Sequence, residues 1–433
     1  MTTALLAELH PPLNDAEAIV EADRCLECGG AAGAPCVHSC PADVDVPSFV
    51  AAIAAGDPGA AARTIFEANL LGGSCARVCP VEELCQSGCV LLHEGREPVP
   101  IGRLQRYATE WAFARPVTLR ERSASTGRQV AVIGAGPAGL AAAGELAARG
   151  HEVTVYDERR EPGGLLRYAI APYRQLKEPL PDEVLVLGTL GVKLRLGVTV
   201  DEELLRTLEE SSDAIVLAVG MGGDVDSGLP GDELEGVWDS LPFIEALKTG
   251  NPPEVGRLTV VIGGGNTAVD CAVELRRLGA THVTMLYRRT EAEMPAYAHE
   301  VELARAEGVE FEWLTAPIRF LGDTRVRAVQ CLRMRLGAPD ESGRRRPEEI
   351  PGSAFVIDAD TVVKAIGQHP RESFLSLIAG VQLERGRIAV DADGRTSAPR
   401  YYAAGDAVNG GSTVVEAVGG AKRVAVAVDE ALR

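Results

Sequence analysis

The hydrophobic and polar positions of the chain follow two patterns, which meet near residue 128. From there on, short apolar runs alternate with glycine turns and helical stretches. Residues 129–133 are therefore predicted as a strand, 137–149 as a helix and 152–156 as a second strand. This order of elements is a βαβ unit, the building block of parallel sheets.

A second copy of the pattern follows, with a strand at 258–262, a helix at 266–278 and a strand at 282–287. The apolar strands at 214–220 and 361–367, each ending in glycine, resemble one another and flank this second copy. Two βαβ units predict two α/β Rossmann-like dinucleotide-binding domains, and the flanking strands indicate that the second is inserted in the first.

The first 125 residues lack this alternation. Helical patterns at 15–22, 47–55, 59–68 and 102–113 are separated by cysteine-bearing turns and show little strand signal. A Ser/Thr/Gly linker then precedes the first βαβ unit. The predicted domains are a helical domain at 1–125, a first dinucleotide-binding domain at 126–240 and 367–433, and an inserted one at 241–366.

Composition narrows the class of protein. Of 433 residues, 46% are hydrophobic and 24% charged, which is typical of a soluble globular protein. A net charge of −19 argues against binding nucleic acid or an anionic membrane through bulk electrostatics. No apolar run approaches the roughly 18 residues of a membrane span, and the N-terminus has no Lys or Arg before Arg24, whereas a signal peptide begins with a positively charged region. We therefore expect a cytoplasmic protein that binds neither nucleic acid nor membranes.

The turn of the first unit carries the G-x-G-x-x-G pattern in its required place between strand and helix. These glycines permit a tight turn and let a pyrophosphate approach the helix N-terminus. Asp157 ends the next strand, where an acid accepts from ribose hydroxyls and repels a 2′-phosphate, so the unit suits FAD or NAD. The predicted contacts are Gly134, Gly136, Pro137, Ala138, Gly139 and Asp157.

The second unit keeps the strand, turn and helix but departs from that glycine spacing. Arg288 and Arg289 follow its second strand, where two guanidinium groups can hold the 2′-phosphate of NADP; the alternative is a solvated loop. The predicted contacts in the turn are Gly263, Gly264, Gly265, Asn266 and Thr267.

Two further segments suit a flavin. Gly405 and Asp406 follow a buried strand, and Thr413 and Val414 lead into a helix whose N-terminus can meet ribityl and phosphate groups. In the alternative interpretation Asp406 is only a turn and cap residue. The turn that ends in Gly164 and Leu165 would bring backbone close to the flavin, or is a plain turn.

Eight of the ten cysteines fall before residue 90. In a reducing compartment such clustering favours a metal site over disulfides, and eight thiols suffice for two tetrathiolate sites. Prolines follow two of these cysteines, as in ferredoxins, which favours iron–sulfur clusters, with structural zinc as the alternative. Cys271 and Cys331 lie in apolar surroundings and are predicted to be buried. The four early pairs are Cys25 and Cys28, Cys36 and Cys40, Cys75 and Cys79, and Cys85 and Cys89.

In combination these motifs are specific. The chain resembles the flavoprotein module shared by glutamate synthase small subunits and dihydropyrimidine dehydrogenases. The resemblance covers nearly the whole chain and rests on the segment from Cys75 to Cys89, IGRLQRYA, VIGAGPAGLAAA, VIGGGNTAVDCA, YRRTEAEMPA and AAGDAVNGGSTVVEAV.

The resemblance implies FAD, two [4Fe–4S] clusters and NADPH or NADH as electron donor. It also implies that Gln105 replaces a cysteine ligand and that Cys75 is a spectator, whereas counting cysteines alone would make Cys75 a ligand. The implied ligand sets are Cys25, Cys28, Cys36 and Cys79 for one cluster, and Cys40, Cys85, Cys89 and Gln105 for the other.

The chemistry implied is hydride transfer from the nicotinamide to the flavin, followed by single-electron transfer to the clusters. Since cofactors carry these steps, no side chain is expected to be catalytic, and no hydrolytic motif is present. The chain is expected to be an electron-input subunit whose larger partner performs the final reduction.

Gln105 favours an FMN and iron–sulfur subunit of dihydropyrimidine dehydrogenase type, which reduces uracil or thymine, as the partner. The alternative partner is the glutamate synthase large subunit. Two other classes of protein are alternatives: a disulfide reductase, for which no cysteine pair is close in sequence beyond residue 90, and a zinc-and-nucleotide scaffold without activity.

Overall fold

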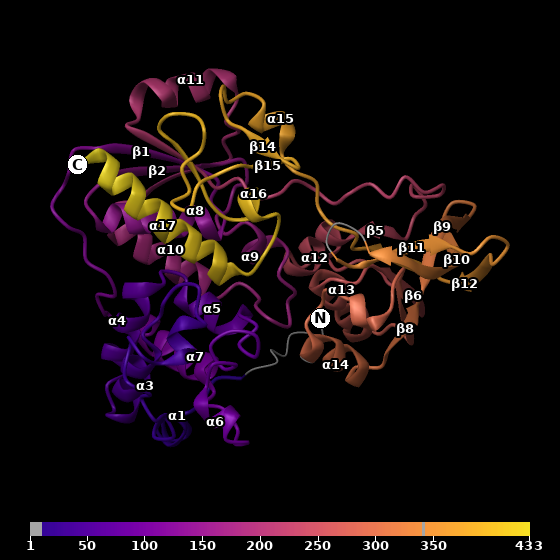
Figure 1. Ribbon diagram of the computed structural model, residues 1–433, viewed down its shortest axis with the longest axis horizontal. Helices are drawn as coiled ribbons and strands as arrows, with labels where there is room; N and C mark the ends of the chain where they lie inside the picture. Colours follow the sequence, from indigo (N-terminus) through magenta and orange to yellow (C-terminus); the bar gives the residue numbers. More distant parts are fainter. Residues whose placement is uncertain (1–10, 340–342) are drawn as a thin grey trace. The chain divides into compact units, whose positions relative to one another are not determined.

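The computed structural model describes residues 11–339 and 343–433, which divide into two compact units (Figure 1). The larger unit comprises residues 11–170, 177–222 and 370–433, and the smaller one comprises residues 171–176 and 223–369. Within the described residues the chain therefore passes between the units four times. Each unit contains its own five-stranded parallel sheet.

The N-terminal part of the larger unit is helical. Its helices are α1 (Asp15–Ala22), α2 (Pro35–His38), α3 (Val46–Ala54), α4 (Pro58–Ala68), α5 (Gly72–Val78), α6 (Val90–His93) and α7 (Ile101–Phe113). Asn14 caps α1, and Asp45 and Asp57 cap α3 and α4, each by accepting a hydrogen bond from a backbone N–H of the first turn. The apolar faces bury a core that contains Phe49 and Phe66.

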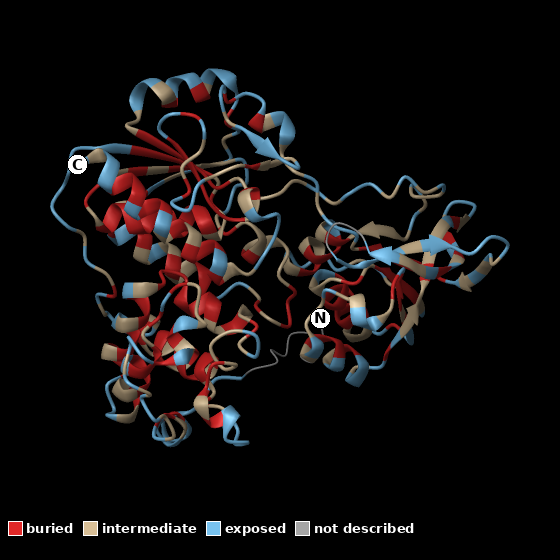
Figure 2. Ribbon diagram, viewed as in Figure 1, coloured by how far each residue is buried: buried red, intermediate tan, exposed pale blue. Residues whose placement is uncertain are grey.

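The rest of the larger unit is a parallel sheet covered on both faces. Its elements are β1 (Gln129–Ile133), α8 (Pro137–Ala148), β2 (Glu152–Asp157), α9 (Leu165–Tyr168), α10 (Leu180–Thr189), β3 (Lys193–Leu196), α11 (Glu202–Ser211), β4 (Ala214–Leu217), α15 (Glu372–Leu375), β14 (Leu383–Glu384), β15 (Arg387–Ile388), β16 (Tyr401–Ala403), α16 (Asp406–Asn409) and α17 (Val414–Leu432). The strand order is β16-β4-β1-β2-β3. Val130 and Val132 of β1 join the core that contains α8 and α17, whereas Ala131 and Ile133 join the core on the other face. Buried residues are concentrated in α8, in α17 and in the strands of the sheet (Figure 2).

The smaller unit combines a second parallel sheet with antiparallel strands. Its elements are β5 (Val237–Asp239), α12 (Ser240–Lys248), β6 (Leu258–Ile262), α13 (Asn266–Arg277), β7 (His282–Tyr287), the short 3₁₀ helix η2 (Glu291–Glu293), α14 (Ala298–Ala306), β8 (Val309–Trp313), β9 (Thr315–Gly322), β10 (Val326–Pro339), β11 (Arg345–Glu349), β12 (Phe355–Asp358) and β13 (Thr361–Lys364). The parallel sheet has the order β5-β13-β6-β7-β8, and β10 pairs with β9, β11 and β12. Arg319, Arg333 and Arg345 lie on these antiparallel strands.

The two parallel sheets share one topological feature. In the larger unit β1 lies between β2 and β4, and in the smaller unit β6 lies between β7 and β13, so the strand order reverses at β1 and at β6. Ligands of open parallel sheets bind at the carboxyl ends of the strands at such a point. The sheet topology therefore predicts ligand sites at the turns after β1 and β6.

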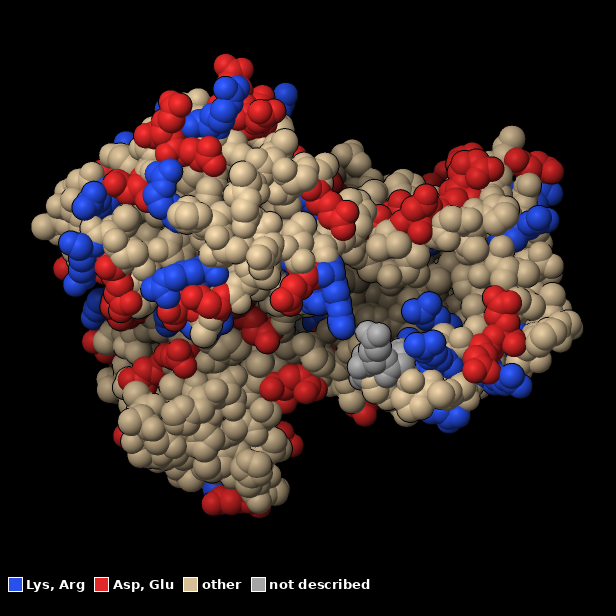
Figure 3. Space-filling view, turned by 45° about the horizontal axis from the view of Figure 1, so that its top comes forward, with Lys and Arg blue, Asp and Glu red and all other residues tan. Residues whose placement is uncertain are grey.

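Most of the predicted elements of the two sheets agree with the structure to within a residue or two. The strands at 214–220 and 361–367 are shorter than predicted, ending at Leu217 and Lys364, because their last residues form the turns that face the glycine loops. The described residues contain no helix with the length and hydropathy of a membrane span. On the faces that Figure 3 shows, acidic and basic side chains are interspersed.

Candidate redox centre

The turn after β1 needs its glycines because other backbone lies against it. Gly134 has φ +108°, and a Cβ atom there would lie 2.2 Å from the carbonyl oxygen of Ala218, just after β4. A Cβ atom on Gly139 would lie 1.9 Å from the carbonyl oxygen of Gly134. Any side chain at either position would push β1, β4 and α8 apart, so the two glycines allow the tight turn that leads into the N-terminus of α8.

Two distant segments meet the same helix N-terminus. A Cβ atom on Gly164 would lie 2.8 Å from the Cα atom of Gly136, and one on Gly405 would lie 2.8 Å from the Cβ atom of Ala138. Leu165 begins α9 directly after Gly164, and Pro137 is the first residue of α8. The structure thus brings three of the predicted flavin segments together at one end of the sheet.

The acidic residues predicted to hold the flavin nucleotide already accept backbone hydrogen bonds. The carboxylate of Asp157 accepts from the N–H groups of Ala135 at 2.6 Å and Arg159 at 2.7 Å. Asp406 accepts from Ser412 N–H at 3.3 Å, and burial raises the pKa of its carboxyl group. Because each carboxylate oxygen has a second lone pair, both residues retain acceptor capacity for a ribose or ribityl hydroxyl.

Thr413 has a structural role that its prediction as a cofactor contact did not include. It is the N-cap of α17, accepts from Glu416 N–H, and forms a capping box with Glu416. Val414 is the first residue of that helix. Both residues therefore fix where α17 begins, beside the turn that carries Asp406.

The turn after β6 repeats the geometry of the first. Gly263 has φ +146°, and a Cβ atom there would lie 2.3 Å from the carbonyl oxygen of Ala365, just after β13. A Cβ atom on Gly264 would lie 2.4 Å from the ring of Tyr287. Gly265 caps α13 in open space, and Thr267 is exposed in its first turn, so the helix N-terminus is accessible to an anion.

The first turn of α13 also carries a residue with a fixed partner. The side-chain oxygen of Asn266 accepts a hydrogen bond from Tyr297 N–H at 3.0 Å. This bond ties the segment before α14 to the start of α13. Asn266 therefore shapes the rim of the predicted nucleotide site.

The two arginines after β7 differ in environment. Arg288 is exposed, whereas Arg289 is only 5% exposed and its Nε donates to the carbonyl oxygen of Arg345 at 2.8 Å. Arg289 thus ties the end of β7 to β11. The structure leaves the exposed guanidinium of Arg288 as the better candidate for a nucleotide phosphate.

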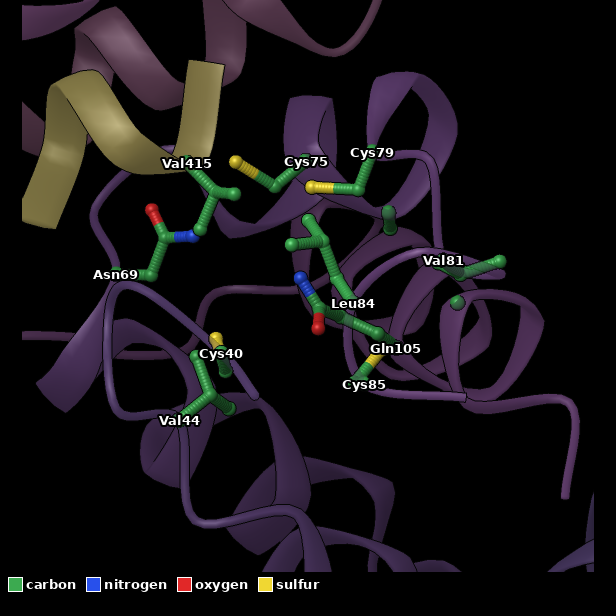
Figure 4. A pocket seen from close by; sticks show the side chains of 12 residues that line it. Cys40, Val44, Asn69, Cys75, Cys79, Val81, Leu84, Cys85, Gln105 and Val415 are labelled. Atoms are coloured by element: carbon green, nitrogen blue, oxygen red, sulfur yellow. The ribbon is translucent and has the colours of Figure 1, made fainter. Parts of the chain in front are cut away.

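Four of the early thiols gather around one cavity in the helical domain. This inner thiol cavity is bordered by α5 and α7 and by Val415 of α17 (Figure 4). Gln105 Nε2 donates to the carbonyl oxygen of Gly72 at 2.6 Å, which leaves the amide oxygen of Gln105 as the atom able to bind a metal. The polar residues that line the cavity are Cys40, Asn69, Cys75, Cys79, Cys85 and Gln105.

The other four thiols line a second cavity, the outer thiol cavity, together with Leu26, Val90 and Leu91. This grouping corrects the expected ligand sets, since Cys89 lies with the first three cysteines of the chain and Cys79 lies with Cys40 and Cys85. The physical reason is that Cys79 ends α5, which borders the inner cavity, whereas Cys89 precedes α6 on the outer side. The thiols of the outer cavity are Cys25, Cys28, Cys36 and Cys89.

Cys75 is not remote from the site. It is 2% exposed, and a hydrogen bond between its thiol and that of Cys79 is the largest of the influences that raise the pKa of Cys79, ahead of burial. The inner cavity therefore holds both candidates, Cys75 and Gln105, for the last ligand position. Sequence counting and family resemblance had each favoured one of them.

Burial makes several of these thiols poor acids when no cation is bound. It raises the pKa of Cys36 to about 11 and raises the pKa of Cys85 further. Iron stabilises the thiolate form and removes this penalty, so sets of buried thiols with an amide oxygen fit iron–sulfur clusters in their donor chemistry. Across the described residues, no three or more His, Cys, Asp or Glu side chains are arranged to hold a single metal ion.

The structure also adds residues that the sequence patterns did not indicate. Asn69 ends α4 and is a common type of residue at a helix end, so its place in the inner cavity left no signal. Glu183 of α10 is fully buried and accepts from the backbone N–H and hydroxyl of Ser74 in α5. Cys271 and Cys331, as predicted, are fully buried.

Comparison with known proteins gives the family. Residues 128–431 match the family described as pyridine nucleotide-disulphide oxidoreductase. Residues 2–117 match the family described as dihydropyrimidine dehydrogenase domain II, 4Fe-4S cluster. The second match resolves the choice between zinc and iron–sulfur in favour of iron–sulfur.

Curated relatives align with nearly the whole chain. The glutamate synthase [NADPH] small chain of Halomonas elongata is 36% identical over 95% of this chain and 90% of its own length, and that of Escherichia coli is 36% identical over 96% and 92%. The NADP(+)-dependent formate dehydrogenase subunit beta of Moorella thermoacetica is 38% identical over 92% of this chain. This chain spans only 60% of the length of that relative.

Solved structures share the fold. FprA from Mycobacterium tuberculosis, in complex with NADPH, superposes with a TM-score of 0.60 at 20% identity, over 70% of this chain and 84% of that chain. Thioredoxin reductase from T. acidophilum gives 0.54 at 22% identity, over 70% and 99%. The chain thus belongs to the pyridine nucleotide-disulphide oxidoreductase family, among relatives that include the glutamate synthase small chains, as an NAD(P)H-dependent FAD oxidoreductase with an N-terminal iron–sulfur domain.

Proposed function

We propose that the chain is the electron-input subunit of a larger enzyme, with FAD in the larger unit and NADPH in the smaller one. The observation that carries this proposal is the pair of equivalent glycine turns, Gly134 against Ala218 and Gly263 against Ala365, in one chain with two thiol cavities. The two parallel sheets are then two Rossmann-like domains, the second inserted in the first. When bound, FAD accepts a hydride from the nicotinamide, and the clusters carry electrons away singly.

The residues assign the nucleotides to their sheets. Asp157 ends β2 with a carboxylate that suits a ribose and disfavours a 2′-phosphate, which supports FAD at the first turn. Arg288, exposed after β7, supports the 2′-phosphate of NADPH at the second, with the N-terminus of α13 facing the pyrophosphate. The chain itself binds, separates and orients the two nucleotides.

The thiol cavities supply two cluster sites. Cys25, Cys28, Cys36 and Cys89 would hold one [4Fe–4S] cluster in the outer cavity. Cys40, Cys79, Cys85 and the amide oxygen of Gln105 would hold the other in the inner cavity. Cys75 is the alternative to Gln105 as the fourth ligand.

The direction of electron transfer follows from what borders each cavity. The inner cavity includes Val415 of α17, a helix of the FAD-binding sheet, so it is the one beside the flavin segments. Leu26 lines the outer cavity and is 54% exposed. Leu92, which directly follows the lining residue Leu91, is 46% exposed. Exposed leucines beside a redox site suit docking of a protein partner, and we place the exit to the partner there.

For the partner, the relatives support a glutamate synthase large subunit better than a subunit of dihydropyrimidine dehydrogenase type. Gln105 in the inner cavity keeps the pyrimidine enzyme as the second candidate, because that family was expected to use a glutamine ligand there. Both candidates need the same input chemistry from this chain.

A reconstitution experiment separates the two. The purified chain is mixed with each candidate partner under anaerobic conditions, and NADPH oxidation is followed with glutamine plus 2-oxoglutarate or with uracil. We expect glutamate formation that depends on this chain. Turnover with uracil alone would assign the pyrimidine partner, and failure to reduce even an artificial acceptor with NADPH would overturn the input role.

A further inference from the structure

Asn69 is a buried amide whose function the fold does not explain. Its side chain is 1% exposed and lines the inner thiol cavity with Cys40, Cys79 and Cys85. Within the part of the chain that the structure describes, its Nδ2 atom has no hydrogen-bond partner. An unpaired buried amide costs on the order of 1–3 kcal/mol, so the position calls for an acceptor inside the cavity.

The orientation of the amide is fixed by the backbone. Asn69 Oδ1 accepts a hydrogen bond from Leu71 N–H at 2.9 Å, and because only the oxygen can accept, the nitrogen must occupy the other side. Figure 4 shows this nitrogen turned toward the cavity and the oxygen turned away. The N–H groups of Asn69 therefore point to the space that the thiols surround.

Asn69 and Gln105 form a complementary pair of amides. The amide nitrogen of Gln105 donates to the carbonyl oxygen of Gly72, so its amide oxygen remains available to bind iron. The amide oxygen of Asn69 accepts from Leu71 N–H, so its amide nitrogen remains available to donate to an acceptor. The rest of the lining is apolar apart from thiols, with Val44, Leu84 and Val415 among the residues nearby. If the amide oxygen of Gln105 binds iron, sulfur atoms are the remaining side-chain acceptors that this cavity can offer to an N–H donor.

We propose that the side chain of Asn69 donates a hydrogen bond to a sulfur atom of the iron–sulfur cluster in the inner cavity and raises the reduction potential of that cluster. The physical reason is that reduction adds negative charge to the cluster, and a hydrogen-bond donor stabilises the more negative state more strongly. Asn69 acts as an electronic tuning residue and not as a ligand. This inference rests on the proposed function, which places a cluster in this cavity.

Spectroscopy of the unaltered protein gives a direct test. The chain is produced with asparagine labelled with ¹⁵N in the side-chain amide, and the reduced inner cluster is examined by pulsed electron paramagnetic resonance. We expect a ¹⁵N coupling to the cluster that disappears in Asn69→Asp and remains in Thr109→Val. Thr109 is a suitable control because it is fully buried in α7, the helix of Gln105, and donates to Arg106 without lining the cavity.

Redox titration gives the second test. Asn69→Leu removes the donor, and Asn69→Asp removes it while an oxygen remains to accept from Leu71. At a fixed potential we expect the ratio of reduced to oxidised inner cluster to be about tenfold lower in each variant, equivalent to about 59 mV for a one-electron couple, with no change in Thr109→Val. A lower potential in Asn69→Asp together with an unchanged one in Asn69→Leu would assign the effect to charge and overturn the hydrogen bond.

The design separates this inference from the function on which it rests. Iron and sulfide content establishes that each variant binds its clusters, and Cys40→Ser establishes which signal belongs to the inner cavity. If Cys40→Ser leaves both cluster signals intact, the cluster assignment is wrong. If it removes one, but the wild-type protein lacks the ¹⁵N coupling, the assignment stands and the role of Asn69 is wrong.

Discussion

The carboxylate of Glu183 in α10 accepts two hydrogen bonds from Ser74 in α5, from the hydroxyl at 2.5 Å and from the backbone N–H at 2.8 Å. This contact joins α10, which packs beside the parallel sheet of the larger unit, to α5, the helix that ends just before Cys79. Burial raises the pKa of Glu183 to about 7, against the effect of the Ser74 hydrogen bonds. Its protonation state therefore changes near neutral pH.

This relationship predicts a pH dependence of stability. Between the ordinary pKa of a glutamate and about 7, the folded chain keeps a proton that the unfolded chain has released, so stability falls as the pH rises through this window. The wild-type free energy of unfolding should fall by on the order of 3 kcal/mol across this window, at about 1.4 kcal/mol per pH unit, and Glu183→Gln should abolish this fall. Urea unfolding at pH 5 and pH 7.5 measures it, with Glu202→Gln on the surface of α11 as control. The prediction would be contradicted if the free energy of unfolding changed with pH equally in the wild-type protein and in Glu183→Gln.

The regrouped thiols predict which variants lose the same cluster. Cys89→Ser should lose the cluster that Cys25→Ser loses, and Cys79→Ser the one that Cys40→Ser loses, because each pair lines one cavity. Iron content and electron paramagnetic resonance of each variant measure this. Loss of the Cys40-dependent signal in Cys89→Ser would restore the pairing expected from the family resemblance. Cys75→Ser should retain both clusters if Gln105 is the ligand.

Arg288 should distinguish the two nicotinamide nucleotides. Arg288→Ala removes a charge-assisted hydrogen bond worth about 1.5–3 kcal/mol, which raises the KM for NADPH about 10- to 100-fold and leaves that for NADH unchanged. Arg289→Ala should instead destabilise the smaller unit, because its buried guanidinium holds Arg345. Steady-state kinetics with both nucleotides and thermal unfolding provide the comparison. A raised KM for NADPH, but not for NADH, in Arg289→Ala and not in Arg288→Ala would assign the 2′-phosphate contact to Arg289 instead.

The two glycine turns should be separable by substitution. Gly263→Ala places a methyl group 2.3 Å from the carbonyl oxygen of Ala365 and should abolish NADPH binding while FAD absorbance remains. Gly134→Ala meets Ala218 in the same way and should abolish FAD binding. Gly188→Ala in α10, which meets nothing within 4 Å, serves as control. Flavin content and NADPH titration measure the outcome, and loss of flavin in Gly263→Ala would show that the two turns are not independent.

The exposed leucine beside the outer cavity should matter only to the protein partner. Leu26→Glu should lower electron transfer to the partner about tenfold or more and leave reduction of ferricyanide by NADPH unchanged, because a charge there opposes docking of an apolar surface. Leu185→Glu is the matched control, since Leu185 is 68% exposed on α10. Equal effects of the two substitutions would remove Leu26 from the docking surface.

Residue pattern and spacing were enough to predict most of the local structure and the kind of chemistry that each motif can support. Strand, glycine turn and helix follow one another over short distances, so the tight turns at Gly134 and Gly263 could be predicted from periodicity and spacing alone. Arg288 and Arg289 were equivalent at that level. The two arginines differ in burial, because the hydrogen bond from Arg289, just after β7, to the carbonyl oxygen of Arg345 in β11 covers only that guanidinium group.

Which thiols share a cavity depends on contacts between distant segments of the chain. Cys79 and Cys89 lie only ten residues apart, and no local pattern indicates that α5 borders one cavity and the start of α6 the other. The position of Asn69 also depends on tertiary structure. Its sequence context indicates only an ordinary helix end, whereas in the structure the hydrogen bond from Leu71 N–H orients the amide nitrogen toward the thiols of the inner cavity. Spacing specifies what a residue can do, whereas packing between distant segments specifies what it faces.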